Sequence, residues 1–418
     1  MEMRRVLIIN STAIGEKGGT GITLENLWCD FPKECVLQLR MDSRIGSYNR
    51  NYKTIDMPTQ FCRIPNVISQ KRQNRREYQR KSVVPLIPSI RQTGIKAAIH
   101  DAIRGVIDVW PLNFKCINKE IDFFLPEIIY SCGASIRILK TSLYYSKRYN
   151  IPIILHLMDD WPNTMYTTSY LSRIFHREML RRLKEVANRS EQSFAISESL
   201  SEKYEQVLGV KMLPLMNPAS NIAENVNIHV DDTVRFVYAG SFGLNRWKSL
   251  LEIAEVLDEE RNNGSQSQFD LYIPTRFLSA EMIKEFGKYN AFLHPYVDRN
   301  ELQSIYKRTD VMVFAESFDE NISEFTKYSL STKIPEYMGT GNAILAYLPA
   351  TSYANSYIRE KEIAFVANSK SELYFIVQDI LNNTKKRYLI ANNALNIVRL
   401  EHSKESERKK LYDAIQKI

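Results

Sequence analysis

The feature that most restricts the fold of this 418-residue chain is a regular alternation of short apolar runs with segments of helical length. The first run, RVLIIN at residues 5–10, is almost continuously apolar, as strands covered on both faces of a sheet are. Similar runs are CVLQL, EIIYSC, IPIILH, QSFAIS and KMLPL, at residues 35–39, 127–132, 151–156, 192–197 and 211–215. Residues 135–148 and 171–186 are long enough for crossover helices. The alternation predicts a doubly wound α/β sheet of parallel strands.

The pattern lapses once and then starts again. Residues 217–232 read NPASNIAENVNIHVDD, a polar stretch typical of a linker between domains. A second series of strands follows: RFVYAG at residues 235–240, then DLYIP, AFLHPYV, DVMVFA, AILAY and IAFVAN. We therefore predict two Rossmann-like domains, at residues 1–220 and 221–395, and a helix at residues 396–418 that packs back toward the first domain. This layout alone does not define a function, because two-domain dehydrogenases share it.

Composition excludes several classes of protein. The chain is 44% hydrophobic and 25% charged, as soluble globular proteins are. No apolar stretch approaches the roughly 20 residues of a membrane-spanning helix. The five cysteines are scattered and never form C-x-x-C, which argues against a disulfide scaffold or a zinc knuckle. We expect a cytoplasmic protein.

The positive charge is concentrated in one part of the chain. The formal net charge is +8, and between residues 63 and 104 the only acidic residues are Glu77 and Asp101. The basic residues there are Arg63, Lys71, Arg72, Arg75, Arg76, Arg80, Lys81, Arg91, Lys96 and Arg104. Tyr78 is the only aromatic residue within residues 71–81, so the alternating aromatics of single-strand nucleic-acid binders are missing. We expect peripheral contact with an anionic membrane, with a solvated helix as the alternative.

Two glycine-containing turns follow predicted strands. In EKGGTGITLENLW, Gly18, Gly19 and Gly21 precede a helix and would let an anionic ligand approach the backbone, although a plain turn uses the same residues. In YAGSFGLNRWKSLL, Arg246 and Lys248 stand at the start of a helix that follows a strand. Ligands bind at such strand ends in open α/β sheets, and two cations there would suit a diphosphate.

The most specific stretch is VFAESFDENISEFTKYSLSTKIPEYMGTGNAIL. Pro335 is tolerated in the first turn of a helix, so a helix is expected to begin there, with Ser331 or Thr332 as its cap. Lys333 is then available to a phosphate. Glu336 can accept hydrogen bonds from the hydroxyls of a ribose.

Four segments together resemble family 4 of the retaining glycosyltransferases. KIPEYMGTGNAIL resembles the C-terminal signature helix of that family, and RWK is similar to its arginine and lysine pair. HLMDDWPNTMY and AISESLSEKY are similar to two stretches of its N-terminal domain. The matches keep the family's order from Gly18 to about Pro349. The resemblance implies the GT-B architecture, in which two Rossmann-like domains face across a cleft, with the acceptor in the first and the donor in the second.

The resemblance also implies a site. The expected donor contacts are Gly19, Gly240, Ser241, Arg246, Lys248, Tyr328, Ser331, Thr332, Lys333 and Glu336. The expected acceptor contacts are Gly18, Thr20, Asp159, Asp160 and Trp161. The expected catalytic residues are Arg246 and Lys248 at the leaving group, and His156 and Asp160 near the acceptor hydroxyl, although the leaving phosphate usually takes the proton in such enzymes. His294 is expected near the nucleobase.

One position departs from the family. Eight residues before Glu336, where the family often has a glutamate, this chain has Tyr328. Either Glu316 or Glu324 takes over the contact with the sugar, or Ser329, Ser331 and backbone N–H groups do. The identity of the donor sugar stays open.

The sequence therefore predicts a metal-independent, retaining hexosyltransferase without a cofactor, whose substrate is a nucleotide diphosphate sugar. The expected acceptor is a saccharide, free or lipid-linked, in the synthesis of bacterial lipopolysaccharide or capsule, at the inner face of the plasma membrane. A metal at His156 and Asp159 would need a third ligand that H-x-x-D does not supply. Two alternatives are a sugar-nucleotide epimerase of the same fold and a non-catalytic protein that binds nucleotides or nucleic acid.

Overall fold

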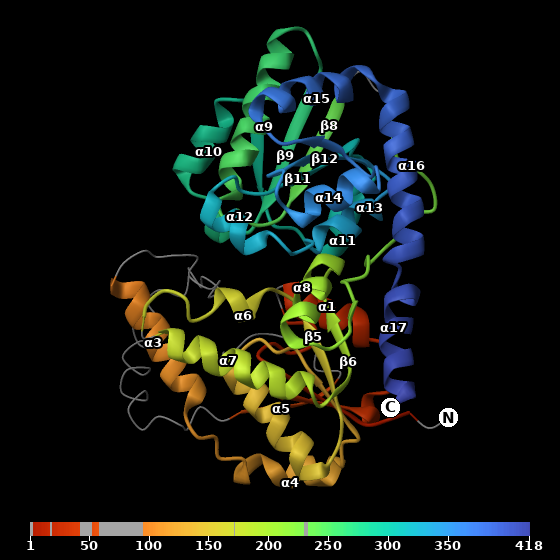
Figure 1. The fold of residues 1–418 in the computed structure, drawn as a ribbon. Helices are drawn as coiled ribbons and strands as arrows, with labels where there is room; N and C mark the ends of the chain where they lie inside the picture. Colours follow the sequence, from red (N-terminus) through yellow and green to blue (C-terminus); the bar gives the residue numbers. More distant parts are fainter. Residues whose placement is uncertain (1–2, 17–18, 42–51, 58–94, 171, 230–232) are drawn as a thin grey trace. The chain divides into compact units, whose positions relative to one another are not determined.

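The chain is described by a computed structural model, which covers residues 3–16, 19–41, 52–57, 95–170, 172–229 and 233–418. It divides into two compact units (Figure 1). The first contains the described residues up to Asn217 together with Lys404–Ile418, and the second contains Pro218–Ser403. The boundaries predicted from the sequence are residues 220 and 395. The basic segment at residues 71–81 and Gly18 lie outside the described residues.

The sheet of the first unit has seven parallel strands in the order β3-β2-β1-β4-β5-β6-β7. Their bounds are β1 Val6–Asn10, β2 Val36–Arg40, β3 Lys53–Asp56, β4 Ile128–Ser131, β5 Ile153–Leu157, β6 Ser190–Ala195 and β7 Met212–Pro214. In the register, Val6 pairs with Val36 on one side and with Ile128 on the other. The order reverses between β1 and β4, as in doubly wound folds.

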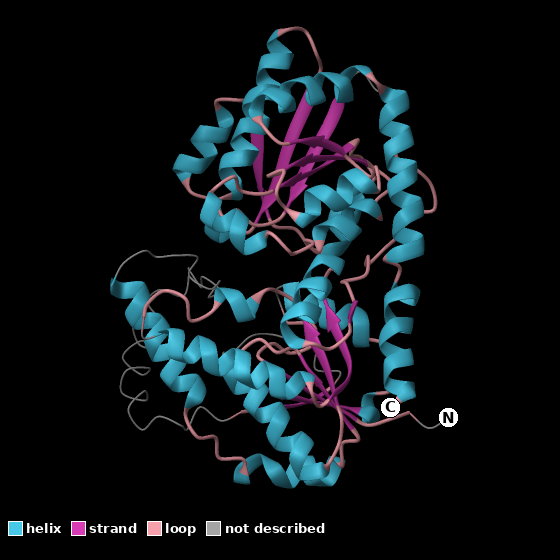
Figure 2. Ribbon diagram, viewed as in Figure 1, coloured by secondary structure: helices cyan, strands magenta, loops and turns pink. Residues whose placement is uncertain are grey.

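Helices lie on both sides of these strands (Figure 2). Their bounds are α1 Gly19–Trp28, α3 Ile95–Val109, α4 Lys115–Phe124, α5 Ile136–Tyr149, α6 Trp161–Thr164, α7 Ser172–Ala187 and α8 Glu198–Leu208, with a 3-10 turn at Lys33–Cys35. The helix expected at residues 135–148 is α5. Ser135 caps it, because its side chain accepts a hydrogen bond from the N–H of Ile138.

The last helix of the chain belongs to the first unit. The predicted helix at residues 396–418 is divided: α16 ends at Glu401 in the second unit, and α17, Lys404–Lys417, packs on α1. Leu411, Ala414 and Ile415 enter the hydrophobic core of the first unit beside Leu24 and Leu27. Arg408 donates from Nε to the carbonyl of Asn26 at 2.6 Å.

The second unit has a six-stranded parallel sheet in the order β10-β9-β8-β11-β12-β13. The strands are β8 Val234–Ala239, β9 Ser267–Ile273, β10 Ala291–Pro295, β11 Val311–Ala315, β12 Ala343–Tyr347 and β13 Phe365–Ala367. The helices are α9 Arg246–Asn262, α10 Ala280–Gly287, α11 Arg299–Tyr306, α12 Glu320–Thr326, α13 Lys333–Met338, α14 Tyr353–Glu360, α15 Lys370–Asn382 and α16 Thr384–Glu401, with a 3-10 turn at Thr275–Phe277.

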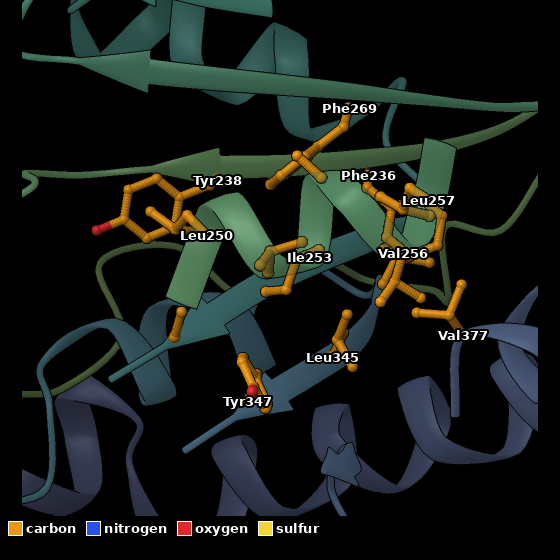
Figure 3. Close-up of a cluster of buried hydrophobic side chains, with 14 of the residues drawn as sticks. Phe236, Tyr238, Leu250, Ile253, Val256, Leu257, Phe269, Leu345, Tyr347 and Val377 are labelled. Atoms are coloured by element: carbon orange, nitrogen blue, oxygen red, sulfur yellow. The ribbon is translucent and has the colours of Figure 1, made fainter. Parts of the chain in front are cut away.

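Helix α9 supplies much of the core of this unit. Leu250, Ile253 and Leu257 point from α9 toward Phe236 and Tyr238 of β8 (Figure 3). These side chains are 0% exposed. Burying an apolar side chain of this size contributes about 1.5 to 3 kcal/mol, so this packing fixes the start of α9 relative to the ends of the strands.

Residues 221–227 pack on the turn that follows α13 in the second unit. Asn221 and Asn225 bring their carbonyl oxygens so close that a Cβ at Gly339 or Gly341 would lie 2.5 and 2.6 Å from them. The N–H groups of Ala223 and Asn227 donate to the carbonyls of Gly339 and Gly341. The glycines of EYMGTG therefore serve this backbone contact.

Within the described residues, no helix combines the length and the apolar character that crossing a membrane requires.

Candidate active site

A cluster of charged side chains lies at the carboxyl end of the second sheet. Parallel strands end at the same edge, and β8 and β11 are neighbours in this sheet. Gly240 directly follows β8, and Glu316 directly follows β11. Arg246 opens helix α9, and Lys333 opens α13. We call Arg246, Glu316, Lys333 and Glu336 the charged cluster.

Arg246 and Glu316 form a buried ion pair with two hydrogen bonds. Arg246 donates from Nε at 3.1 Å to one carboxylate oxygen of Glu316 and from Nη2 at 3.0 Å to the other. The side chain of Glu316 is 7% exposed and that of Arg246 17%. The Oγ of Ser249 donates to the carbonyl of Glu316 at 2.7 Å. This fork holds the guanidinium in one orientation and leaves Nη1 without a hydrogen bond to the described residues.

Lys333 is the member of the cluster whose charged atom is buried without a hydrogen bond to the described residues. Its Nζ is covered and has no hydrogen-bond partner among the described residues. It lies 4.0 Å from the centre of the Tyr238 ring, and a Cβ on Gly240 would be 1.8 Å from it. Burial, followed by the charge of Arg246, lowers the pKa of Lys333 to about 7, while Glu316 and Glu336 oppose the shift. Burying an amine without a hydrogen-bond acceptor costs free energy. The position of this atom therefore indicates a binding site for an anion.

Glu336 lies one turn after Lys333 on α13. It makes no side-chain hydrogen bond to the described residues. Burial raises the pKa of Glu336, and the charges of Lys333 and Arg299 act against that shift. The cluster thus contains two basic and two acidic groups, and two of its four members lack protein partners for their polar atoms.

Lys248 is not part of the charged cluster. It is exposed on α9, and its Nζ lies 5.9 Å from the centre of the Trp247 ring. Lys333, rather than Lys248, lies beside Arg246 in this structure, because a helix directs residues two apart to different faces. The sequence signal for Lys333 was present in KIPEY.

The remaining residues that were expected to contact the donor lie in both units. The carbonyl of Ser241 accepts from the hydroxyl of Tyr238 at 2.7 Å. The Oγ of Ser331 accepts weakly from the N–H of Lys333 at 3.4 Å, and Thr332 precedes α13 without capping it through its side chain. Tyr328 is half-buried. Gly19 opens α1 of the first unit and is exposed.

Glu316 and Glu324 have different surroundings. Glu324, on α12, is 72% exposed and pairs with Lys327 at 3.3 Å. Glu316 is buried within the cluster, with both carboxylate oxygens bonded to Arg246. Sequence reasoning missed this pair because its members are 70 residues apart and meet only through the pairing of β8 with β11.

His156, expected as a catalytic residue, lies in the core of the first unit. It is 0% exposed within β5. Its Nε2 lies 2.9 Å from the carbonyl of Leu215, to which only an N–H can donate, so Nδ1 accepts from the hydroxyl of Tyr130 at 2.5 Å. Burial lowers the pKa of His156 to about 3. A neutral ring with both nitrogens bonded to the core is not available to an acceptor.

Asp160 is also bonded within the first unit. Its carboxylate, 4% exposed, accepts from Lys203 Nζ at 2.7 Å and from the hydroxyl of Tyr204 at 2.7 Å. Two of the resembling segments, HLMDDW and AISESLSEKY, are thus joined by these bonds, and Ser197 of the second segment caps α8. The carboxylate fixes the turn at the end of β5, with each of its oxygens accepting one hydrogen bond from the first unit.

The other expected acceptor residues lie in two places. Asp159 and Trp161 flank Asp160, and both are half-buried. Thr20 is half-buried in the first turn of α1. Gly18 lies outside the described residues. Gly21 keeps the loop tight, because a Cβ there would be 2.1 Å from the carbonyl oxygen of Glu16.

His294, expected near the nucleobase, ends β10 and stacks on Tyr272 with ring centres 4.8 Å apart. Asp270 lies 2.6 Å from its Nε2. Within the described residues, no three His, Cys, Asp or Glu side chains are grouped so as to hold a metal ion.

Two Rossmann-like units, each built on a parallel sheet, have the GT-B fold. The chain is similar over its whole length to three solved structures of this fold. They are a UDP-forming trehalose-phosphate synthase from Burkholderia vietnamiensis (10% identity, 99% of this chain and 100% of that chain, TM-score 0.59), sucrose-phosphate synthase from Thermosynechococcus elongatus (12%, 99% of each, TM-score 0.61) and HepE of Anabaena in complex with UDP and glucose (13%, 100% of each, TM-score 0.59).

These likenesses establish the fold. No protein-family model and no curated protein matches the sequence.

Proposed function

We propose that this chain is a glycosyltransferase that moves a hexose from a nucleotide diphosphate sugar to an acceptor hydroxyl. The observation that carries the proposal is the covered Nζ of Lys333, which has no hydrogen-bond partner among the described residues and lies beside Arg246 at the strand ends. Sites of this kind in open α/β sheets bind ligands at the strand ends. The complex of HepE with UDP and glucose, on the same fold, agrees with a nucleotide sugar as the ligand.

The proposed chemistry needs only charge stabilisation at the leaving group. The bond between the anomeric carbon and the diphosphate breaks, and the diphosphate takes the electron pair. Lys333 Nζ and Arg246 Nη1 would donate to its oxygens as the negative charge develops. Preorganised donors of this kind typically lower a barrier by about 2.7 to 4 kcal/mol each.

We assign Glu316 to the positioning of Arg246 rather than to the sugar. Its two oxygens accept hydrogen bonds from Nε and Nη2 of Arg246. Nη1 of the guanidinium is therefore the nitrogen that remains available to a ligand. Glu336, whose carboxylate is not bonded to the described residues, is the proposed acceptor for the ribose hydroxyls.

The finer parts of the proposal follow from the resemblance to family 4. They are a retaining course, independence of a metal and a saccharide acceptor, free or carried on a lipid. In a retaining course the acceptor oxygen bonds to the same face of the sugar from which the diphosphate departs. Its proton then passes to an oxygen of the leaving phosphate. This route agrees with the bonded states of His156 and Asp160, because it requires no base from the first unit.

The first test is calorimetric titration with UDP, GDP and ADP and with the matching nucleosides. We expect one diphosphate to bind, and Arg246→Ala to weaken it by about tenfold to a hundredfold, as the loss of a charge-assisted hydrogen bond does. Binding of the nucleoside should not change. Lys248→Ala, which removes an exposed cation from the same helix, is the matched control. If no diphosphate binds, or if both variants lose the same affinity, the assignment is wrong.

A second measurement separates transfer from epimerisation. The protein is incubated with the sugar nucleotide of the diphosphate that binds and with a crude saccharide acceptor. Release of the nucleoside diphosphate with glycosylation of the acceptor supports the proposal. Accumulation of a second sugar nucleotide in place of a glycosylated product would favour the epimerase.

A further inference from the structure

The ring of Tyr238, at the end of β8, faces the amine of Lys333. Nζ of the lysine lies 4.0 Å from the centre of the ring. This distance is well inside the roughly 6 Å over which the quadrupole of an aromatic ring attracts a cation. The side chain of Tyr238 is 0% exposed, so water screens the attraction little. The ring therefore favours the charged form of the lysine.

Contacts within the second unit fix the position of this ring. The hydroxyl of Tyr238 donates to the carbonyl of Ser241 at 2.7 Å. Figure 3 shows the ring beside Leu250 of α9, in the same core. Gly240 leaves room for the amine, because a Cβ there would be 1.8 Å from Nζ of Lys333 and 3.2 Å from the hydroxyl oxygen of Tyr238. We call the ring of Tyr238 and the backbone of Gly240 the lysine seat.

The carboxylates of the charged cluster do not bind the amine. Nζ of Lys333 has no hydrogen bond to any described residue. Both oxygens of Glu316 already accept from Arg246. Glu336, three residues further along α13, acts on Lys333 through its charge alone. The amine thus faces the ring of Tyr238, two carboxylates and a guanidinium, and it makes close contact with the ring.

A ring and a carboxylate have different effects on a lysine that has to bind an anion. A carboxylate accepts the N–H groups of the amine, so the ligand has to displace it. A ring attracts the positive charge without taking these N–H groups in strong hydrogen bonds. The ring also opposes part of the desolvation, which favours the neutral amine. An amine in such a seat keeps its donors available to a ligand.

We propose that Tyr238 is a positioning residue whose ring holds the amine of Lys333 apart from the carboxylates and stabilises its charged form for binding a diphosphate. The effect on ligand affinity rests on the proposed function. The effect on the charge of the free lysine does not, because it requires no ligand.

The test uses rings of nearly equal volume that attract a cation less and less. Tyr238→Phe keeps the ring, and phenylalanine analogues with one, two or three ring fluorines at the same position weaken its quadrupole step by step. Over this series the pKa of free Lys333 should fall by about one unit, as expected when a desolvated cation–π contact is lost. The carbon-13 resonance of Cε of Lys333, assigned with Lys333→Arg, measures this pKa without ligand.

Phe236 is the matched control site. It precedes Tyr238 by two residues on β8, lies in the same core and is also 0% exposed. The same fluorinated analogues at Phe236 change a buried ring of the same strand. They should leave the pKa of Lys333 unchanged.

Affinity for the nucleoside diphosphate should follow the charge of the lysine. The pKa of Lys333 is about 7, so nearly all molecules of every variant carry a charged amine at pH 5.5. Tyr238→Phe and its trifluorinated analogue should then bind about equally at pH 5.5 and differ about tenfold at pH 8. A ring that only fills space predicts the same ratio of affinities at both pH values.

Two results would overturn the inference. One is a pKa of Lys333 that stays constant through the fluorinated series, or that changes as much with the analogues at Phe236. The other is a diphosphate that binds with an affinity ratio independent of pH. A protein whose Lys333 responds to the series but which binds no nucleoside diphosphate would support the lysine seat and refute the proposed function instead.

Discussion

Binding of a diphosphate at Lys333 should take up a proton from solution. In the free protein, burial lowers the pKa of Lys333 to about 7, so at pH 8 about nine in ten molecules carry a neutral amine. The anion favours the charged form, which raises the pKa again on binding. Because the free lysine is neutral above its lowered pKa and the bound lysine is charged, the sign of the exchange is uptake. At pH 8 it should amount to about 0.9 proton per bound diphosphate.

Calorimetry at pH 8 in two buffers of different ionisation enthalpy measures this number. At that pH the terminal phosphate, with a pKa of about 6, is fully ionised and contributes little. Lys333→Arg keeps the positive charge at all accessible pH values, so its uptake should fall close to zero. The affinity of the wild type should decline by up to about tenfold between pH 7.5 and 8.5, while that of Lys333→Arg stays flat. Uptake below about 0.2 proton in the wild type, or equal uptake in both proteins, refutes the reasoning.

Two further predictions concern the same cluster. Lys333→Met should stabilise the ligand-free protein near pH 7, because it removes a buried amine without an acceptor. In the wild type, the pKa of Lys333 is about 7 in the folded state and near 10.5 in the unfolded state. Between these pH values the unfolded state binds more protons, so the free energy of unfolding of the wild type should rise with pH relative to that of the variant. Thermal melts of both proteins from pH 7 to 9 measure this difference. Glu336→Gln should weaken the nucleoside diphosphate about tenfold without lowering the melting temperature. A 2′,3′-dideoxy nucleotide should bind the wild type and this variant equally, and a variant that melts earlier with full affinity would mean that Glu336 has only a structural role.

Much of the fold could be predicted from the sequence, because parallel strands covered on both faces appear as continuous apolar runs. Each predicted run of the second domain corresponds to a strand. Strand β3, Lys53–Asp56, was missed because KTID is polar and lies at the edge of its sheet, with only Ile55 buried. The two Rossmann-like domains are confirmed by the sheets.

The candidate site was only partly predictable, because side-chain partners depend on tertiary contacts. The sequence pattern ended the fourth predicted strand, IPIILH, at His156, which would have placed that residue at the open edge of the sheet. In the structure β5 continues to Leu157, and the preceding strand residues are all buried, so His156 lies inside the core. The local sequence pattern predicts that a strand is apolar. It does not predict the residue at which the strand leaves the core.

The position of α17 has a consequence for the order in which the chain can fold during synthesis. Residues 218–403 form the second unit and leave the ribosome before Leu411, Ala414 and Ile415, which complete the core of the first unit. The unit that is translated first therefore finishes last. Until then, the apolar residues of α1 that later contact α17 are exposed to solvent. A nascent chain arrested near residue 403 therefore contains all residues of the second unit but lacks part of the core of the first.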